Sequence, residues 1–350
     1  MSRRFTGAVT IALAGLTLSA LSALSACSSS SSVPTSTSTS TSTSTGASTG
    51  SATAAATKYS MELVVGTKSD DFYRTMECGA EAEAAQLGVN LTVTGPADFS
   101  PSEQAPILNA VAVSKPDTLI VAPTDASALD PELQRIQSSG TKLVFVDTDS
   151  SDTSLGLSRI TSDNLGGGKL AADSLAAQIG GKGTVAVIDV EPGISTTDAR
   201  IQGFNQEMKA KYPGITVLPT QYDNDSPATA ATQVIGDIAA HPNLSGVFAT
   251  NVLSAQGAAT GVQHSHMSGK VKVATFDADP QQMAALQSDT IQLAIAQDPF
   301  LEGQDGVQQA LNALEGKPVT ASIATPLVAI TRQNMNQPSV SKYVYVSSCS

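Results

Sequence analysis

Short apolar runs alternate with longer amphipathic segments from about residue 59 to residue 330. The runs are often β-branched and lack regular polar alternation, which is typical of strands buried on both faces of a parallel sheet. They are MELVVG (61–66), VNLTV (89–93), TLIVA (118–122), KLVFVD (142–147), TVAVIDV (184–190), GITVLPTQY (214–222), GVFAT (246–250), VKVATFD (271–277) and IQLAIAQ (291–297).

The segments between these runs have helical periodicity and close on glycine, as many helices do. Examples are RTMECGAEAEAAQLG at 74–88 and NLGGGKLAADSLAAQIGG at 164–181. A βαβα order of this kind predicts an α/β fold with doubly wound parallel sheets and right-handed crossovers. The folded part exceeds the ~100 to 200 residues typical of one domain, so two lobes are expected.

Polar side chains stand at the carboxyl ends of several predicted strands, which is where ligands bind in doubly wound sheets. They are the segment 68–73, Asp147, Asn251, Asp277 and Gln297. Any one of them alone is more simply explained as a helix cap. Together, at corresponding strand ends, they indicate a binding site.

The amino terminus has a different pattern. Arg3 and Arg4 precede an apolar run at 8–24, which at about 17 residues is shorter than the ~20 of a membrane-spanning helix. This order predicts a signal peptide at 1–26, with a spanning anchor as the alternative. The residues Leu24-Ser25-Ala26-Cys27 resemble the lipobox of bacterial lipoproteins, which implies that Cys27 is lipidated.

Residues 27–57 consist almost entirely of Ser, Thr, Ala and Gly and carry no charge. Such a composition cannot bury enough apolar surface to fold, so this segment is predicted to be a disordered tether. A flexible chain of this length spans about 30 Å on root-mean-square average. The function is therefore expected to reside in residues 58–350, outside the cytoplasm.

The formal net charge of −12 is unfavourable for a protein that binds nucleic acid or anionic lipid headgroups. Besides Cys27 the chain has two cysteines, Cys78 and Cys349. In an oxidising compartment we expect them to form a disulfide, with two free thiols as the alternative.

No cofactor, metal site or catalytic centre is predicted. The segment GGGKLAA at 166–172 lacks the spacing of a phosphate-binding loop, and no GxSxG elbow is present. His241, His264 and His266 lack further convergent ligands for a metal. Asp147 and Asp277 could be an acid and base pair for glycoside hydrolysis, but two acceptors for sugar hydroxyls are the stronger interpretation.

In combination the motifs resemble periplasmic sugar-binding proteins of the ribose-binding type, relatives of the ligand domains of lactose-repressor-like regulators. The resemblance runs from about residue 59 to 330. It is carried by VVGTKSDDFYRTMECGAEAEAAQLG, VFVDT, ITSDNLGGGKLAA, GISTTDARIQGF, ATNVLSAQGAA, ATFDADP and LAIAQDPF. It implies the type I periplasmic-binding-protein fold, in which two doubly wound parallel-sheet lobes are joined by a three-strand hinge.

The resemblance implies an N-terminal lobe at 58–162 plus 298–325, and a C-terminal lobe with its tail at 163–297 plus 326–350. The chain would recross between the lobes near Gln297-Asp298 and again near Thr325-Pro326. A ligand in the cleft would favour the closed arrangement of the lobes.

The resemblance also implies a ligand site. Phe72 and Tyr73 would cover the faces of a sugar ring, and Asp70 stands where the family often has a ligand-binding Asn. The side chains implied to hydrogen-bond sugar hydroxyls are those of Asp147, Arg200, Asn251, Asp277 and Gln297. Asp277 and Arg200 could also pair with each other. Which residue of the 222–225 loop lines the cleft is left open.

Two positions depart from the ribose-binding pattern. Thr148 stands where ribose binders commonly carry Arg, and Val252 where an acidic residue is expected. A neutral monosaccharide or related polyol is therefore expected rather than ribose itself.

The function implied is that of a solute-binding protein of an ABC transporter, not an enzyme, which delivers its sugar to the permease. It would be a monomer, extracytoplasmic, held on the bacterial cell membrane by the lipid on Cys27 alone, with no nucleic-acid partner. A receptor for a sugar-like signal and an extracellular sugar-processing enzyme are the alternatives.

The last twenty residues, 331–350, lie beyond the resemblance. A bridge between Cys78 and Cys349 would make this tail run back across the first lobe and pack the YVYV segment at 343–346 against it. Because both ends of the bridge would then lie on that lobe, we expect Cys349→Ser to lower thermal stability and to leave ligand affinity near normal.

Overall fold

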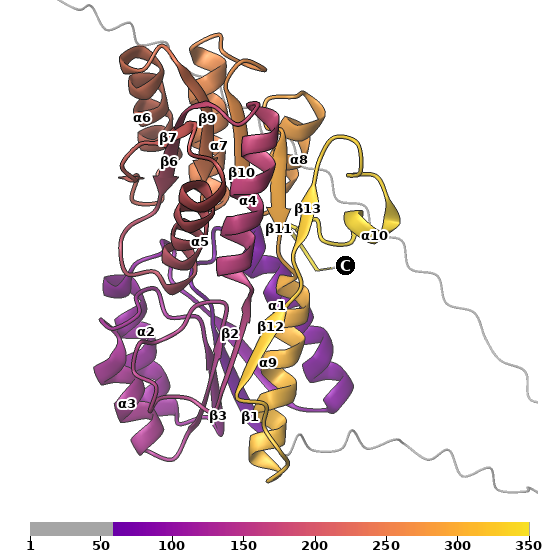
Figure 1. Ribbon diagram of the computed structural model, residues 1–350. Helices are drawn as coiled ribbons and strands as arrows, with labels where there is room; N and C mark the ends of the chain where they lie inside the picture. The colour runs from indigo at the N-terminus through magenta and orange to yellow at the C-terminus, as the bar shows by residue number, and fades with distance from the viewer. Residues whose placement is uncertain (1–58, 350) are drawn as a thin grey trace, which may run out of the picture. The chain divides into compact units, whose positions relative to one another are not determined.

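The computed structural model describes residues 59–349 and folds them around two sheets (Figure 1). The predicted signal peptide at 1–26, the lipidated Cys27 and the tether at 27–57 lie outside the described residues. Within the described part of the chain, no helix combines the length and apolar character needed to span a membrane.

The first sheet has the strand order β12-β5-β4-β3-β1-β2, and all its strands are parallel. Its strands are β1 (Ser60–Val64), β2 (Asn90–Thr94), β3 (Thr118–Val121), β4 (Lys142–Val146), β5 (Ser158–Ser162) and β12 (Ser322–Thr325). Its helices pack as two pairs, α1 (Asp71–Leu87) with α9 (Pro299–Leu314), and α2 (Pro101–Ser114) with α3 (Asp130–Ser138) (Figure 1). This sheet and these helices form the first lobe.

The second sheet has the order β13-β11-β10-β9-β6-β7, with β8 beside β6, and only β13 is antiparallel to its neighbour. Its strands are β6 (Gly183–Asp189), β7 (Ile215–Val217), β8 (Gln221–Tyr222), β9 (Leu244–Ala249), β10 (Lys272–Phe276), β11 (Leu293–Ala296) and β13 (Val328–Ile330). Its helices are α4 (Asn164–Gln178), α5 (Ser195–Lys211), α6 (Pro227–Ala240), α7 (Val252–His264) and α8 (Pro280–Gln287). These elements form the second lobe.

The predicted fold class is confirmed, because both sheets are built from parallel strands linked by helices. Each of the nine apolar runs contains a strand, but GITVLPTQY is divided into β7 and β8 around Pro219, which has no backbone N–H to donate. Three strands, β5, β12 and β13, were not predicted. They lack the continuous apolar character of strands buried on both faces, as the alternating burial of β5 shows.

The chain passes between the two sheets three times within the described residues. The crossings join β5 to α4, β11 to α9 and β12 to β13. Loops of the two lobes also touch, since the backbone N–H of Asp149 donates to Ser195 Oγ at 2.9 Å and that of Ala126 to the Gly193 carbonyl at 3.0 Å. The lobes are thus in contact both at the crossings and through these loops.

The C-terminal tail, residues 331–349, differs in part from the expectation. It contains α10 (Pro338–Ser341), and its Cys349 forms a disulfide with Cys78 of α1 in the first lobe. The backbone N–H of Tyr345, however, donates to the Ala278 carbonyl of the second lobe at 3.0 Å. The tail therefore contacts α1 of the first lobe, as expected, through the disulfide and the hydrogen bond from the Val346 N–H to Thr75 Oγ1. Its additional contact with the second lobe was not predicted.

Candidate functional site

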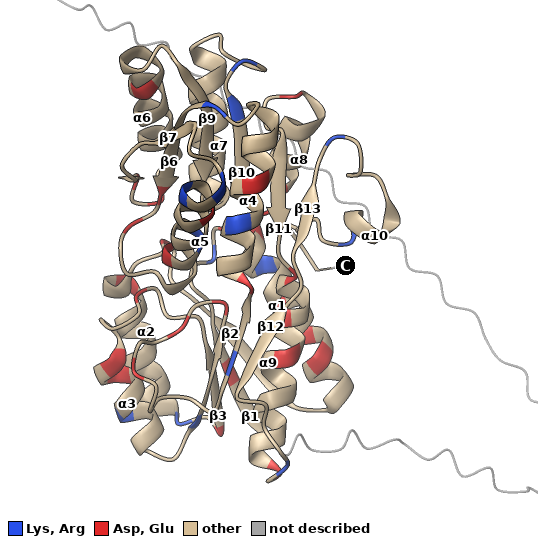
Figure 2. Ribbon diagram, in the orientation of Figure 1, with Lys and Arg blue, Asp and Glu red and all other residues tan. Residues whose placement is uncertain are grey.

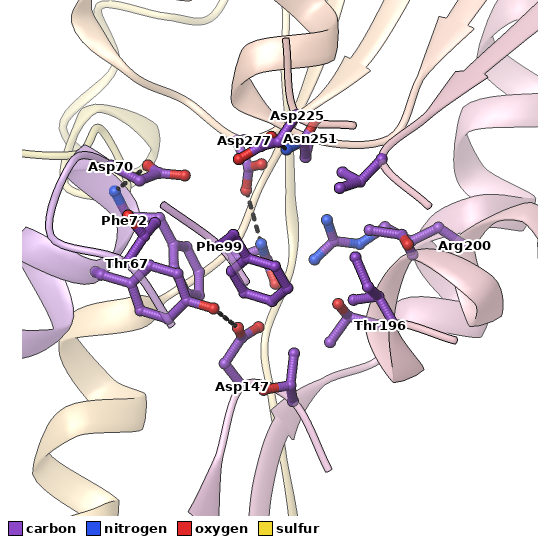
Figure 3. Close-up of a pocket in the computed structure, with 16 residues that line it drawn as sticks. Thr67, Asp70, Phe72, Phe99, Asp147, Thr196, Arg200, Asp225, Asn251 and Asp277 are labelled. Carbon is purple, nitrogen blue, oxygen red and sulfur yellow. Dashed lines mark hydrogen bonds between the residues drawn. The ribbon is translucent and has the colours of Figure 1, made fainter. Parts of the chain in front are cut away.

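A pocket lies between the lobes, at the carboxyl ends of strands from both sheets (Figure 3). All eight side chains predicted to bind the ligand line it: Asp70, Phe72, Tyr73, Asp147, Arg200, Asn251, Asp277 and Gln297. They come from segments spread between residue 70 and residue 297 of the chain, so the structure brings them together. Their role in ligand binding remains a prediction.

Asp147 and Asp277 occupy equivalent positions in the two lobes. Each directly follows a strand, β4 or β10, and each has left-handed backbone geometry, with φ of 59° and 74°. Their backbone N–H groups donate to the carbonyls of Ile160 and Ile295 on the neighbouring strands, both at 2.8 Å. Asp is one of the few residues with a side chain that adopts this region readily. The backbone of each Asp can therefore remain hydrogen-bonded to the neighbouring strand while the chain turns at the pocket.

Asp147 is 6% exposed and accepts a hydrogen bond from the Tyr73 hydroxyl at 2.6 Å (Figure 3). Burial raises the pKa of this carboxyl to about 6, although the bond from Tyr73 and the charge of Arg200 both lower it. Asp147 therefore changes charge close to neutral pH. Tyr73 was predicted to cover a sugar face, and it also orients this acceptor.

Arg200 extends from α5 into the pocket (Figure 3). Its Nε donates to Asn164 Oδ1 at 2.8 Å, its Nη1 donates to the Thr250 carbonyl at 2.7 Å, and its guanidinium carbon lies 4.1 Å from the centre of the Phe276 ring. No ion pair joins it to Asp277 among the described residues, so that pairing is a correction to the sequence analysis. The guanidinium is held by neutral acceptors and a ring face instead.

Asp277 accepts a hydrogen bond from Gln297 Nε2 at 2.7 Å on its Oδ1 (Figure 3). Burial raises the pKa of this carboxyl, while the charge of Arg200 and the bond from Gln297 lower it. The Gln297 Oε1 atom is buried and has no hydrogen-bond partner among the described residues. Its acceptor capacity is therefore unused within the described part of the chain.

Asp70 caps α1, where its Oδ1 accepts from the backbone N–H of Phe72 at 2.8 Å. Burial, followed by the negative charge of Asp277, raises the pKa of Asp70 well above its usual range. A neutral carboxyl both donates and accepts hydrogen bonds, as an Asn amide does. Burial thus favours the form of Asp70 whose hydrogen-bonding capacity is like that of an Asn amide.

Aromatic side chains form one wall of the pocket. The rings of Phe72 and Tyr73 meet edge to face at 5.1 Å, and Phe99 stacks on Tyr73 at 6.3 Å between centres. Phe99 was not predicted. It lies in the loop after β2, at the carboxyl end of the strand, so the same strand-end rule could have identified it.

The sequence left open which residue of the 222–225 loop lines the cleft, and the structure shows that Asp225 does. Its Oδ1 accepts from Asn251 Nδ2 at 2.7 Å, and Asn251 in turn caps α7. The remaining lining residues are Thr67, Thr148, Val190, Ile194, Thr196 and Thr197. Thr196 and Thr197 directly precede Asp198 in the GISTTDAR segment, so the motif that located Arg200 already contained them.

The pocket has four carboxyl groups and one guanidinium, and acidic residues also occur in loops near the boundary of the two lobes (Figure 2). No group of three or more His, Cys, Asp or Glu side chains in the described part of the chain is arranged to hold a metal ion. A neutral ligand with many hydroxyls suits this set, because hydroxyls can donate to the carboxylates and accept from the guanidinium.

Comparison with known proteins identifies the family of the chain. The family model described as "Periplasmic binding protein domain" matches residues 61–318. The ribose import binding protein of Escherichia coli (strain K12) is 29% identical over 277 residues, which cover 79% of this chain and 92% of that protein.

Two solved structures are also similar. An ABC transporter solute-binding protein from Agrobacterium vitis, bound with α-D-tagatopyranose, is 41% identical with a TM-score of 0.81, over 83% of this chain and 100% of that one. A carbohydrate transporter solute-binding protein from Agrobacterium radiobacter, in complex with D-arabinose, is 29% identical with a TM-score of 0.78. The match covers 82% of this chain and 98% of that one. These relatives are binding proteins for transport rather than enzymes.

Proposed function

The chain belongs to the periplasmic binding protein family, and on this premise we propose that it is a lipid-anchored solute-binding protein of an ABC transporter. It binds a monosaccharide or related polyol between its lobes and delivers it to the permease. Relatives that bind D-tagatose and D-arabinose support a sugar as the ligand class. The lipid anchor rests on the Leu24-Ser25-Ala26-Cys27 sequence, and membrane fractionation of a Cys27→Ala variant tests it.

The observation that carries the proposal is the combination of buried, unsatisfied polar atoms with an aromatic wall. Thr148 and Gln297 line the pocket, and their Oγ1 and Oε1 atoms are buried and have no partner among the described residues. Leaving a buried polar atom unpaired costs about 1–3 kcal/mol. A sugar supplies hydroxyls to such atoms and a less polar face to Phe72 and Phe99.

A thermal-shift screen over pentoses, hexoses, tetritols and pentitols tests the ligand class. A ligand at 100 times its dissociation constant stabilises the folded chain by about 2.7 kcal/mol. At least one neutral sugar or polyol is expected to raise the melting temperature. If only charged ligands such as amino acids do so, the sugar assignment is wrong, and conversion of any sugar in the panel would show an enzyme instead.

Arg200→Ala tests whether binding occurs in this pocket. The substitution removes a donor from Asn164 Oδ1 and from the Thr250 carbonyl, both buried, and we expect affinity to fall by roughly 2–4 kcal/mol. Arg135→Ala, at an exposed position of α3, is the matched control. Equal affinities in both variants would place the site elsewhere.

A further inference from the structure

The C-terminal tail contacts residues that line the pocket, although it lies outside the segment that the family model matches, which ends at residue 318. Beyond α10 the tail contacts the second lobe at Ala278 and α1 at Thr75. Three contacts then fasten it to α1: the Val346 backbone N–H donates to Thr75 Oγ1 at 2.8 Å, Ser347 Oγ donates to Asp71 Oδ2 at 3.0 Å, and Cys349 is bonded to Cys78. The tail is thus secured on the helix that also carries Asp70, Phe72 and Tyr73.

Tyr345 is the tail residue that meets the site. Its side chain is 2% exposed, and its hydroxyl donates to Asp277 Oδ1 at 2.9 Å. The same hydroxyl oxygen accepts from the backbone N–H of Gln297 at 3.3 Å. Its ring meets the Phe72 ring edge to face at 5.7 Å. One side chain from the tail therefore contacts a pocket residue of the first lobe and two of the second.

The contact on Asp277 determines how that carboxylate is presented. A carboxylate has about four acceptor positions. Tyr345, Gln297 and the backbone of Val252 all hydrogen-bond the Asp277 carboxylate. These bonds fix the rotation of the carboxylate and leave little of its capacity for other partners, so a ligand hydroxyl meets an acceptor of defined direction.

We propose that Tyr345 is a positioning residue of the ligand site, which orients the Asp277 carboxylate, and that the Cys78–Cys349 bridge keeps it in place. The inference rests on the proposed function, in which Asp277 binds a sugar hydroxyl. It replaces the expectation that Cys349→Ser leaves ligand affinity near normal. Without the bridge the end of the tail frays, and Tyr345 then spends part of its time away from Asp277.

A residue that only fills space would not change the charge state of Asp277. The hydrogen bond from Tyr345 lowers the pKa of this carboxyl, so its removal raises that pKa. The Tyr345→Phe substitution leaves in place the other charged groups that interact electrostatically with Asp277. These are Arg200 of α5, Asp70, Asp147, Asp225 and Asp279. A shift measured in a Tyr345 variant therefore reports the lost hydroxyl.

The experiment compares the full chain with Tyr345→Phe and with the double variant Cys78→Ala/Cys349→Ala. Tyr343→Phe, which deletes a hydroxyl two residues earlier in the tail, is the matched control. Calorimetric titration with D-tagatose, D-ribose and D-arabinose gives the dissociation constants across pH. Carbon-13 NMR of the ligand-free proteins follows the titration of the Asp277 carboxyl.

For Tyr345→Phe we expect the dissociation constant of the tightest of these sugars to rise about tenfold, as for loss of a bond to a charged group. The pKa of the Asp277 carboxyl is expected to be higher than in the unsubstituted chain. As the solution is acidified, the loss of sugar affinity is therefore expected to begin at a higher pH in this variant. The double cysteine variant should change in the same direction, and Tyr343→Phe should match the unsubstituted chain.

Unchanged affinity together with an unchanged Asp277 titration in Tyr345→Phe would overturn the inference. If Tyr345→Phe does not fold, the double cysteine variant tests the inference in its place. Unchanged sugar affinity together with an unchanged Asp277 titration in the double variant would then overturn the inference. A chain that binds none of the three sugars and nothing in the wider screen overturns the proposed function instead. The Asp277 titration, which needs no ligand, still shows whether Tyr345 fixes this carboxylate.

Discussion

Asp147 shows how a single strand-end residue acquires its chemistry. Its position after β4 puts its carboxyl at the pocket, but burial, the Tyr73 hydroxyl and Arg200 set its charge state. The pKa of about 6 lies well above the usual 3.8, because burial outweighs both favourable partners. The carboxyl is therefore ionised at pH 7 and becomes neutral in mildly acidic solution.

Sugar affinity is expected to fall as the pH drops below about 6. A sugar hydroxyl donates more strongly to a carboxylate than to a neutral carboxyl, so binding favours the ionised form of Asp147 and must displace its proton at low pH. Calorimetric titration between pH 5 and 8 measures this dependence. Asp147→Asn should bind more weakly at pH 8 and show a flatter profile; a flat profile in the unsubstituted chain would contradict the prediction.

At the scale of elements, helix α9 contacts all three crossings between the lobes near its first turn. Glu302, in its first turn, is fully buried, and its Oε1 accepts from Ser162 Oγ and Thr325 Oγ1, both at 2.8 Å. Ser162 ends β5 and Thr325 ends β12, so two crossings start beside this carboxyl, and the third leads directly into α9. Burial, and then the negative charge of Asp147, raise the pKa of Glu302 to about 8.

Glu302→Gln is expected to make stability less dependent on pH. The unfolded chain releases the Glu302 proton near pH 4.5, whereas the folded chain retains it to about pH 8. The contribution of this group to stability is therefore full below pH 4.5 and is lost as the pH rises towards 8. Between pH 5 and 8 the variant should lose about 3–4 kcal/mol less of its free energy of unfolding than the unsubstituted chain.

Urea unfolding at several pH values measures this difference. Glu81→Gln, an exposed substitution in α1, serves as the control and should leave the pH dependence unchanged. Parallel curves for Glu302→Gln and the unsubstituted chain would mean that Glu302 is already ionised at neutral pH.

At the scale of the whole molecule, the tail adds a fourth link between the lobes. The chain crosses three times through the segments beside β5, β11 and β12, and the tail crosses again from β13 to Cys78. The disulfide joins residues 271 positions apart, so it encloses almost the entire folded chain in one loop. Such a bridge restricts the unfolded chain far more than the folded one.

Replacing both cysteines by alanine is expected to lower the free energy of unfolding by about 2–5 kcal/mol. Because the loop is long, most of this loss arises from the greater freedom of the unfolded chain. Thermal unfolding with and without a dithiol reductant measures it. The reductant should destabilise the unsubstituted chain and leave the double variant unaffected; an unsubstituted chain insensitive to reductant under unfolding conditions would show that the bridge does not form.

The sequence alone determined the α/β class, nine strand regions and which side chains stand at strand ends, because the period of apolar residues and the order of elements are local properties. Tertiary structure decided the partners and charge states: Tyr73 on Asp147, neutral acceptors on Arg200, and Glu302 between two crossings. It also decided where the tail runs, since no periodic pattern in 331–350 could show that Tyr345 meets Asp277, 68 positions earlier. Burial and long-range hydrogen bonds depend on which segments pack together, and that is a property of the folded chain.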